Sequence, residues 1–234
     1  MPVVSNLVSP GPVGQRPGKI APDGSPVELY LRLSSGPAPA IIDKALPRRA
    51  SILDLGCGTG AVAHELRRLG HIVTGVDECA EMLEHVRVPS IRGRIEELRL
   101  PDRFDAVILA SHLLNPVPPS MRLRYLRTCR EHVRDDGRVL LEMHDPNAFA
   151  DAPLERSCED GVMRIYDVVQ LGDNAKKATL SWTFGDRSWT QQVTVWHVGP
   201  AALDRDLAAA GLRRDGAING EPRWVIAVPA AGTP

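Results

Sequence analysis

Between residues 50 and 143, short apolar runs alternate with helical segments, and this alternation restricts the fold more than any other feature of the chain. Such runs, each followed by an amphipathic segment, are typical of strands buried on both faces of a sheet. The expected strands are Ser51–Leu55, His71–Val76, Phe104–Ala110 and Gly137–Met143, and the expected helices are Ala61–Leu69, Ala80–Arg87 and Met121–Val133. Strands that alternate with helices pair in parallel through right-handed crossovers, so we expect an α/β fold with helices on both faces of the sheet.

The pattern changes after residue 150, where extended segments are joined by turns. The expected strands are Val162–Leu171, Ala178–Phe184 and Trp189–Trp196, then Trp224–Val228 after a helix at Pro200–Ala210. The segments Gly172–Asn174 and Gly185–Ser188 have the composition of hairpin turns. We therefore expect one domain over residues 25–234 that carries a small antiparallel insertion at about residues 160–197. Residues 1–24 are rich in proline and glycine, which predicts a disordered or draped arm.

Composition argues against several classes of function. The chain has 28 Lys and Arg against 29 Asp and Glu, a net charge of −1, so no field that would attract nucleic acid or an anionic membrane is expected. We see no signal peptide and no apolar stretch long enough to span a membrane, which predicts a cytoplasmic protein. The four cysteines lie far apart in the sequence, so we expect neither a disulfide framework nor a structural zinc site.

The stretch Ile52–Gly60, ILDLGCGTG, delivers an acidic residue and three glycines from a strand onto a helix N-terminus. Glycine allows positive φ angles and close approach of a ligand to the backbone, and the free amides there suit a carboxylate or a phosphate. Two classes of cofactor compete for this loop. The spacing Gly56-x-Gly58-x-x-Ala61 fits a dinucleotide loop, and Asp77 ends the next strand at the expected distance.

Asp54 and Gly60 discriminate between the two classes of cofactor. A carboxylate beside the loop is unfavourable for a pyrophosphate but useful for an ammonium group. The loop therefore predicts an adenosyl amino acid, with Asp77 accepting hydrogen bonds from the ribose hydroxyls.

These motifs resemble those of the class I S-adenosylmethionine-dependent methyltransferases. The resemblance rests on Ile52–Gly60, Gly75–Asp77 and Phe104–Ile108, and it covers about residues 25–145. It implies a Rossmann-like sheet of seven strands, mostly parallel with the last strand antiparallel. It also implies S-adenosyl-L-methionine as the cofactor and S-adenosylhomocysteine as the product.

The resemblance further implies which residues contact the cofactor. They are Tyr30, Asp54, Gly56, Cys57, Gly58, Gly60, Asp77, Glu78, Met82, Ile95, Glu96, Ala110 and Ser111. Asp54 and Gly56 would lie near the methionine end, and Tyr30 would belong to a lid. Many relatives have an aspartate where this chain has Arg94, which cannot accept a hydrogen bond. We therefore expect the adenine contact to come from the Ile95 backbone or from Glu96.

Two histidines follow expected strands at the edge where open α/β sheets bind ligands, His112 after Ala110 and His144 after Met143. Each is a candidate catalytic base, and the alternative role is packing or hydrogen bonding within the loop. The segment Asn115–Pro118 partly resembles the Asn/Asp-Pro-Pro-aromatic motif of amino-methylating DNA enzymes. It lacks the aromatic residue and begins beyond the strand end, so it does not change the expectation of no nucleic-acid partner. No metal site is expected, because Ser111-His112 stands where metal-dependent relatives carry carboxylates.

Tryptophans concentrate in the expected antiparallel insertion, which holds Trp182, Trp189 and Trp196. Trp182 and Phe184 should project from one face of their strand, over a small core, a substrate pocket or a dimer surface. This layout is similar to that of small-molecule methyltransferases acting on amino sugars and related natural products. We therefore predict methyl transfer to an oxygen or nitrogen of a small molecule in natural-product metabolism, by a monomer or homodimer. The alternatives are an NAD(P)-dependent oxidoreductase and a non-catalytic cofactor-binding subunit.

Overall fold

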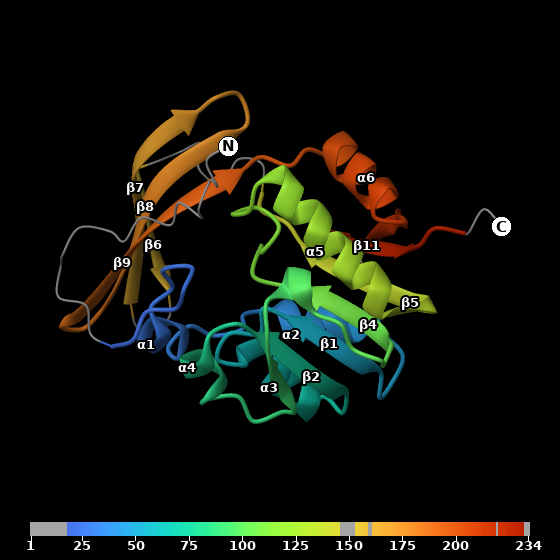
Figure 1. Cartoon of the computed structure of the whole chain (residues 1–234). Coiled ribbons are helices and arrows are strands. Elements are labelled where there is room, and N and C mark those ends of the chain that lie inside the picture. Colours follow the sequence, from blue (N-terminus) through green and yellow to red (C-terminus); the bar gives the residue numbers. More distant parts are fainter. Residues whose placement is uncertain (1–17, 146–152, 159–160, 219, 232–234) are drawn as a thin grey trace.

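The computed structural model describes residues 18–145, 153–158, 161–218 and 220–231, so most of the expected N-terminal arm lies outside the described residues. The main sheet consists of β1 (Ser51–Leu55), β2 (Ile72–Asp77), β3 (Ser90–Arg92), β4 (Phe104–Leu109), β5 (Val133–Glu142), β10 (Leu212–Ile218) and β11 (Glu221–Pro229). Its order is β10-β11-β5-β4-β1-β2-β3 (Figure 1). β11 runs antiparallel to both β5 and β10, whereas the other pairs are parallel. The expected sheet, mostly parallel with a reversed last strand, is confirmed.

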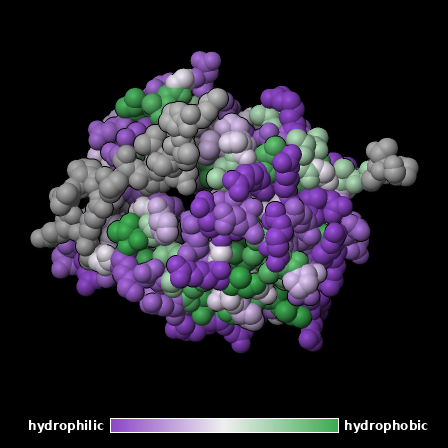
Figure 2. Space-filling view, in the orientation of Figure 1, coloured by the Kyte–Doolittle hydropathy of each residue, from purple (hydrophilic) through white to green (hydrophobic). Residues whose placement is uncertain are grey.

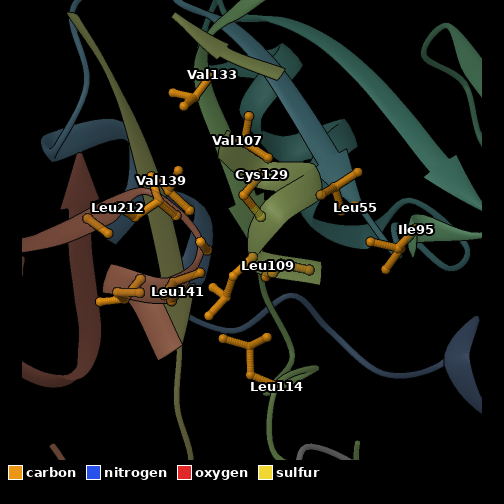
Figure 3. Close-up of a cluster of buried hydrophobic side chains, with 14 of the residues drawn as sticks. Leu55, Ile95, Val107, Leu109, Leu114, Cys129, Val133, Val139, Leu141 and Leu212 are labelled. Carbon is orange, nitrogen blue, oxygen red and sulfur yellow. The ribbon is translucent and has the colours of Figure 1, made fainter. Parts of the chain in front are cut away.

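Helices cover both faces of this sheet because its strands are apolar on both sides. Alternate residues of β1 point in opposite directions, so that Leu53 and Leu55 join one buried cluster and Ile52 joins the other. The first cluster packs under α5 (Pro119–His132) and α6 (Pro200–Ala209), and Figure 3 shows its side chains gathered between sheet and helix. The second packs under α2 (Ala38–Lys44) and α3 (Ala61–Arg68). The carboxyl ends of the strands remain available for a site.

A second sheet stands beside the first in Figure 1 and contains β6 (Leu154–Cys158), β7 (Gly161–Leu171), β8 (Ala175–Phe184) and β9 (Arg187–Trp196). All three pairs are antiparallel, which confirms the small antiparallel sheet. Trp182 lies directly opposite Trp189, so Trp182 and Phe184 share the face on which Trp189 is buried, 2% exposed. The guanidinium of Arg32 lies 5.6 Å from the centre of the Trp189 ring, so this face meets the N-terminal segment.

The differences from the expected elements occur in short or polar segments. β3, β6 and β10 were not expected as separate strands, because each is short or contains few apolar residues. The expected helix Ala80–Arg87 is only the short α4 (Ala80–Leu83). The Arg87 amide donates to the ring of His64 at 2.8 Å instead of continuing the helix.

The remaining short helices are α1 (Val27–Tyr30) and the 3-10 helix η1 (Ile95–Glu97). No helix in the described ranges is both long and apolar enough to cross a membrane. The face shown in Figure 2 is largely hydrophilic, and its hydrophobic side chains form small separate patches.

Candidate cofactor and acceptor site

The glycine loop between β1 and α3 is anchored on the end of β2. The amides of Gly56 and Cys57 both donate to the carbonyl of Val76, at 2.8 and 2.9 Å, and the Gly58 amide donates to Asp77 Oδ2 at 2.9 Å. These bonds turn the backbone sharply after β1. The φ angles of the three glycines at 56, 58 and 60 are 74°, 54° and 87°, a region that side chains rarely adopt.

The space around these glycines differs in a way that indicates where a ligand can lie. A Cβ at Gly56 would stand 2.5 Å from Leu113 Cδ1, and one at Gly60 would stand 2.8 Å from His64 Nε2. A Cβ at Gly58 would meet nothing within 4 Å. The loop is thus packed against protein at both ends and open at its centre.

Asp54 is the chemically distinctive residue of the loop. It is 2% exposed, and its Oδ2 atom is buried without a hydrogen-bond partner in the part of the chain that the structure describes. Burial, assisted by the charge of Asp77, raises its pKa from 3.8 to about 7. An unpaired buried carboxylate is costly, so the position favours a ligand that brings a positive charge.

Asp77 is held by the backbone on both sides. Its Oδ2 accepts from Gly58, and its Oδ1 accepts from the Cys79 amide at 2.9 Å. Burial raises its pKa, and these two bonds partly oppose the increase. A carboxylate has about four lone-pair sites, so each oxygen can still accept from a hydroxyl.

Cys57 is a buried packing residue rather than a reactive thiol. A Cβ at Gly75 would lie 2.7 Å from its sulfur, so the side chain fills the space above the β2 backbone. Burial raises the pKa of the thiol far above its usual range. The backbone of Cys57 shapes the loop, since its amide donates to Val76 and its carbonyl accepts from Gly60.

The N-terminal segment covers the glycine loop. The Tyr30 carbonyl accepts from the Thr59 hydroxyl at 3.2 Å, and the Tyr30 hydroxyl accepts from Ser25 at 3.3 Å. Tyr30 packs against a small buried cluster that includes Met82 of α4. The structure therefore brings Tyr30, Met82 and the loop together, as the resemblance implies.

The segment that the resemblance places next to adenine, Ile95 and Glu96, is buried and hydrogen-bonded to residues that the sequence did not indicate as its partners. Ile95 and Glu96 are 8% and 7% exposed. The Ile95 carbonyl accepts from the Thr128 hydroxyl at 2.9 Å, and Glu96 Oε1 accepts from Arg94 Nε at 2.8 Å. The charge of the Arg94 guanidinium is thus paired with the Glu96 carboxylate, two residues further along the chain.

Glu78 is exposed at the rim, where its backbone carbonyl accepts from Arg92. Its pKa is raised by burial and by the charges of Glu96, Asp23 and Asp77, with Arg94 opposing the increase. Several carboxylates therefore lie at this rim, together with Arg92 and Arg94.

The loop after β4 brings the two candidate histidines together. Ala110 is buried, and Ser111 and His112 both have positive φ angles, 55° and 60°. Such angles cost a non-glycine residue roughly 1–2 kcal/mol. The Ser111 amide donates to Glu142 Oε2 at 2.8 Å, and the rings of His112 and His144 stack with centroids 4.2 Å apart and an interplanar angle of 24°. We call these two rings the histidine pair.

The histidine pair is neutral at physiological pH. Burial lowers the pKa of His112 to about 4, with a contribution from the charge of Arg223. Burial, His112 and Arg223 lower the pKa of His144 to about 3. His112 Nε2 lies 3.8 Å from Glu142 Oε1, and His112 Nδ1 is buried with no partner among the described residues. Each neutral imidazole keeps one ring N–H and offers its other nitrogen as an acceptor, so neither ring holds a second proton near pH 7.

Two buried polar residues lie beside the site, Asn115 and Thr128, each 2% exposed. Sequence reasoning considered Asn115 only as part of an incomplete motif and did not single out Thr128, which no motif marks. Within the described ranges, no group of three His, Cys, Asp or Glu side chains is placed to hold a metal ion.

Comparison with known proteins agrees with this geometry. Residues 52–137 match the family described as a methyltransferase domain. The cypemycin N-terminal methyltransferase of a Streptomyces species is 28% identical over 148 residues, which cover 56% of this chain and 58% of that protein. The chain spans about half the length of the curated relatives it matches.

Two solved structures share the fold over most of the chain. CalS10 of Micromonospora echinaspora, an amino pentose methyltransferase with S-adenosylmethionine bound, has a TM-score of 0.68 at 21% identity, covering 87% of this chain and 94% of its own. The sugar N-methyltransferase KedS8 of Streptoalloteichus has a TM-score of 0.69 at 17% identity, covering 95% and 98%. Residues 52–137 therefore match the methyltransferase-domain family, and the chain shares the fold of these solved methyltransferases.

Proposed function

We propose that this protein transfers a methyl group from S-adenosyl-L-methionine to an oxygen or nitrogen of a small molecule. The observation that carries the proposal is the buried carboxylate of Asp54, which lies beside a glycine loop and has one oxygen with no hydrogen-bond partner in residues 18–145 or the other described ranges. Residues 25–234 would act as one domain, in the cytoplasm, with β6–β9 as its insertion.

The residues present fit this cofactor. Asp54 would receive the ammonium group of the methionine end, and Asp77 would receive the ribose hydroxyls. Ile95 and Met82, both buried, would supply apolar contacts to the adenine. When bound, the cofactor supplies an electrophilic methyl group.

A dinucleotide fits less well, because its pyrophosphate would enter a region of negative charge. The carboxylates of Asp23, Asp77 and Glu96 raise the pKa of Glu78, and only Arg94, which is paired with Glu96, opposes them there. Asp54 adds a further buried acid directly at the loop. Like charges held this close disfavour an anionic ligand and favour a cationic one.

The acceptor would lie at the carboxyl ends of β4 and β5, next to the histidine pair. Alignment of two reactants contributes roughly 7–11 kcal/mol without any base. Because both rings are neutral and weakly basic, His112, whose Nδ1 has no partner among the described residues, would orient an amine or hydroxyl by accepting its hydrogen bond, and His144 would support that ring through the stack. The names of the similar proteins, an N-terminal, an amino pentose and a sugar N-methyltransferase, favour an amine of a natural product.

Calorimetry with S-adenosylhomocysteine and with NADH tests the cofactor. We expect binding of S-adenosylhomocysteine, weakened at least tenfold in Asp54→Asn and unchanged in Asp105→Asn. Asp105 lies at the start of β4, at the opposite edge of the sheet, where it accepts from Ser51. Binding of NADH alone would refute the proposal. Mass spectrometry of amines, phenols and carboxylates incubated with a labelled methyl donor then identifies the acceptor.

A further inference from the structure

Asn115 has more hydrogen bonds than any function assigned above explains. It is 2% exposed, its side-chain Nδ2 donates to the Trp196 carbonyl at 3.0 Å, and its Oδ1 accepts from the His144 amide at 2.9 Å. Its backbone amide donates to the His112 carbonyl at 2.9 Å, and its carbonyl accepts from the Trp196 amide at 2.7 Å. Every polar group of the residue therefore has a partner within the chain.

These bonds join three segments that are far apart in the sequence. His112 belongs to the loop after β4, His144 follows β5, and Trp196 ends β9 of the second sheet. Asn115 is thus the junction between the two sheets on the side where the acceptor would bind. Because both ends of its amide are occupied, the side chain is not free to bind a methyl acceptor as the amide of an Asn-Pro-Pro motif would.

We propose that Asn115 is a positioning residue that holds the histidine pair in its stacked arrangement and fixes the distance from that pair to the end of β9. The role of Asn115 in catalysis rests on the proposed function, because only a methyltransferase would use the histidine pair and β9 as two walls of an acceptor site. The junction itself is a property of the fold and can be tested without a methyl acceptor.

The surrounding backbone explains why such a junction is needed. Ser111 and His112 both adopt left-handed angles, and an isolated turn of this kind relaxes unless its neighbours hold it. The bond from the Asn115 amide to the His112 carbonyl closes the turn, and Pro116 and Pro118 follow with restricted φ angles. The side chain of Asn115 then anchors this stiff segment to β5 and β9.

The test is nuclear magnetic resonance of the full chain labelled with ¹⁵N-histidine, which reports the protonation state of each imidazole. Signals of the pair are assigned with His112→Gln and His144→Gln. In the wild type, both rings remain neutral at pH 5.5 because they are largely buried. In Asn115→Ala, the stack opens and the rings become hydrated. The pKa of at least one of the two rings therefore rises by about one unit or more. Glu142 and Arg223, the charged groups that act on the pair, are unchanged in this variant.

Two further variants make the result decisive. Asn115→Ser keeps a shorter polar side chain, which a water molecule can bridge to the His144 amide, so we expect a smaller increase than with alanine, and it serves where the alanine variant does not fold. Ser51→Ala removes a hydroxyl bonded to Asp105 at 2.7 Å at the far edge of the sheet, and should destabilise the protein without moving either midpoint. Folded Asn115 variants with wild-type midpoints for both rings would overturn the proposal. Affinity for S-adenosylhomocysteine, measured in parallel, tests the proposed function separately.

Discussion

Asp54 and Asp77 lie near the carboxyl ends of the paired strands β1 and β2, and the charge of Asp77 adds to burial in raising the pKa of Asp54 to about 7. In the unfolded chain the Asp54 pKa is near its ordinary value, 3.8. The folded state therefore binds more protons between about pH 4 and pH 7, and its stability falls as the pH rises through this window.

Asp54→Asn should stabilise the ligand-free protein at pH 8 and leave it nearly unchanged at pH 4. At high pH the amide removes a buried negative charge, which destabilises the folded state by on the order of a few kcal/mol. At low pH the carboxyl is already protonated, so the substitution removes no charge. Differential scanning calorimetry at the two pH values measures the difference in melting temperature. An equal shift at both would show that the Asp54 carboxyl titrates normally.

Binding of S-adenosylhomocysteine should weaken on acidification below pH 7, approaching tenfold per pH unit. The ammonium group of the ligand pairs with the ionised form of Asp54, and that form is lost as the carboxyl takes up a proton. Calorimetric titrations between pH 5.5 and 8 measure the slope. The same titrations with Asp54→Asn should give a nearly flat dependence, and an equal slope in the variant would assign the titration to another group.

Gly56→Ala should abolish measurable binding of S-adenosylhomocysteine and lower the melting temperature. The new methyl group would stand 2.5 Å from Leu113 Cδ1, so the loop or Leu113 must move. Gly36→Ala is the matched control, since Gly36 has a φ of 54° but open space around its Cβ position. The control substitution should lower the free energy of unfolding by only about 1 kcal/mol and leave binding of S-adenosylhomocysteine intact. Equal effects of the two substitutions would mean that backbone angle alone, and not contact with Leu113, makes Gly56 necessary.

Thr128→Val should reduce both stability and cofactor affinity. It removes the hydroxyl that donates to the Ile95 carbonyl and leaves that carbonyl only the longer bond from the Leu98 amide at 3.3 Å, and the loss of one hydrogen bond costs about 0.5–1.5 kcal/mol. The loop that carries Ile95 would then be less well ordered for adenine. Thr183→Val, which removes an exposed contact with Ser188, provides the same change of residue type without a buried partner. Chemical denaturation and calorimetry compare the two variants, and a Thr128 variant that binds like wild type would place the adenine elsewhere.

The sequence was sufficient to predict the features that depend on neighbouring residues. The alternation along β1, β2 and β4 predicted a parallel sheet because each strand is buried on both faces. Asp54 and the glycines are contiguous, so their grouping at the end of β1 followed directly. Proximity of His112 and His144 was also implied, since both follow strands that end at the same edge of the sheet.

Features that depend on distant pairs were not accessible in this way. Nothing local indicates that Asn115 bonds to Trp196, 81 residues away, or that Thr128 bonds to Ile95, 33 residues away. β6 and β10 form because a neighbouring strand supplies hydrogen bonds, not because their own residues are apolar. The same holds for the contact between Gln191 of β9 and Ser25 of the N-terminal segment.

The position of β11 has a consequence for how the chain is made. β11 (Glu221–Pro229) lies between β5 and β10, so both of those strands have an open edge until it has been synthesised. Unpaired strand edges are sites of aggregation. During translation, a nascent chain that ends before residue 221 would therefore expose the edge of β5 that β11 covers in the folded structure.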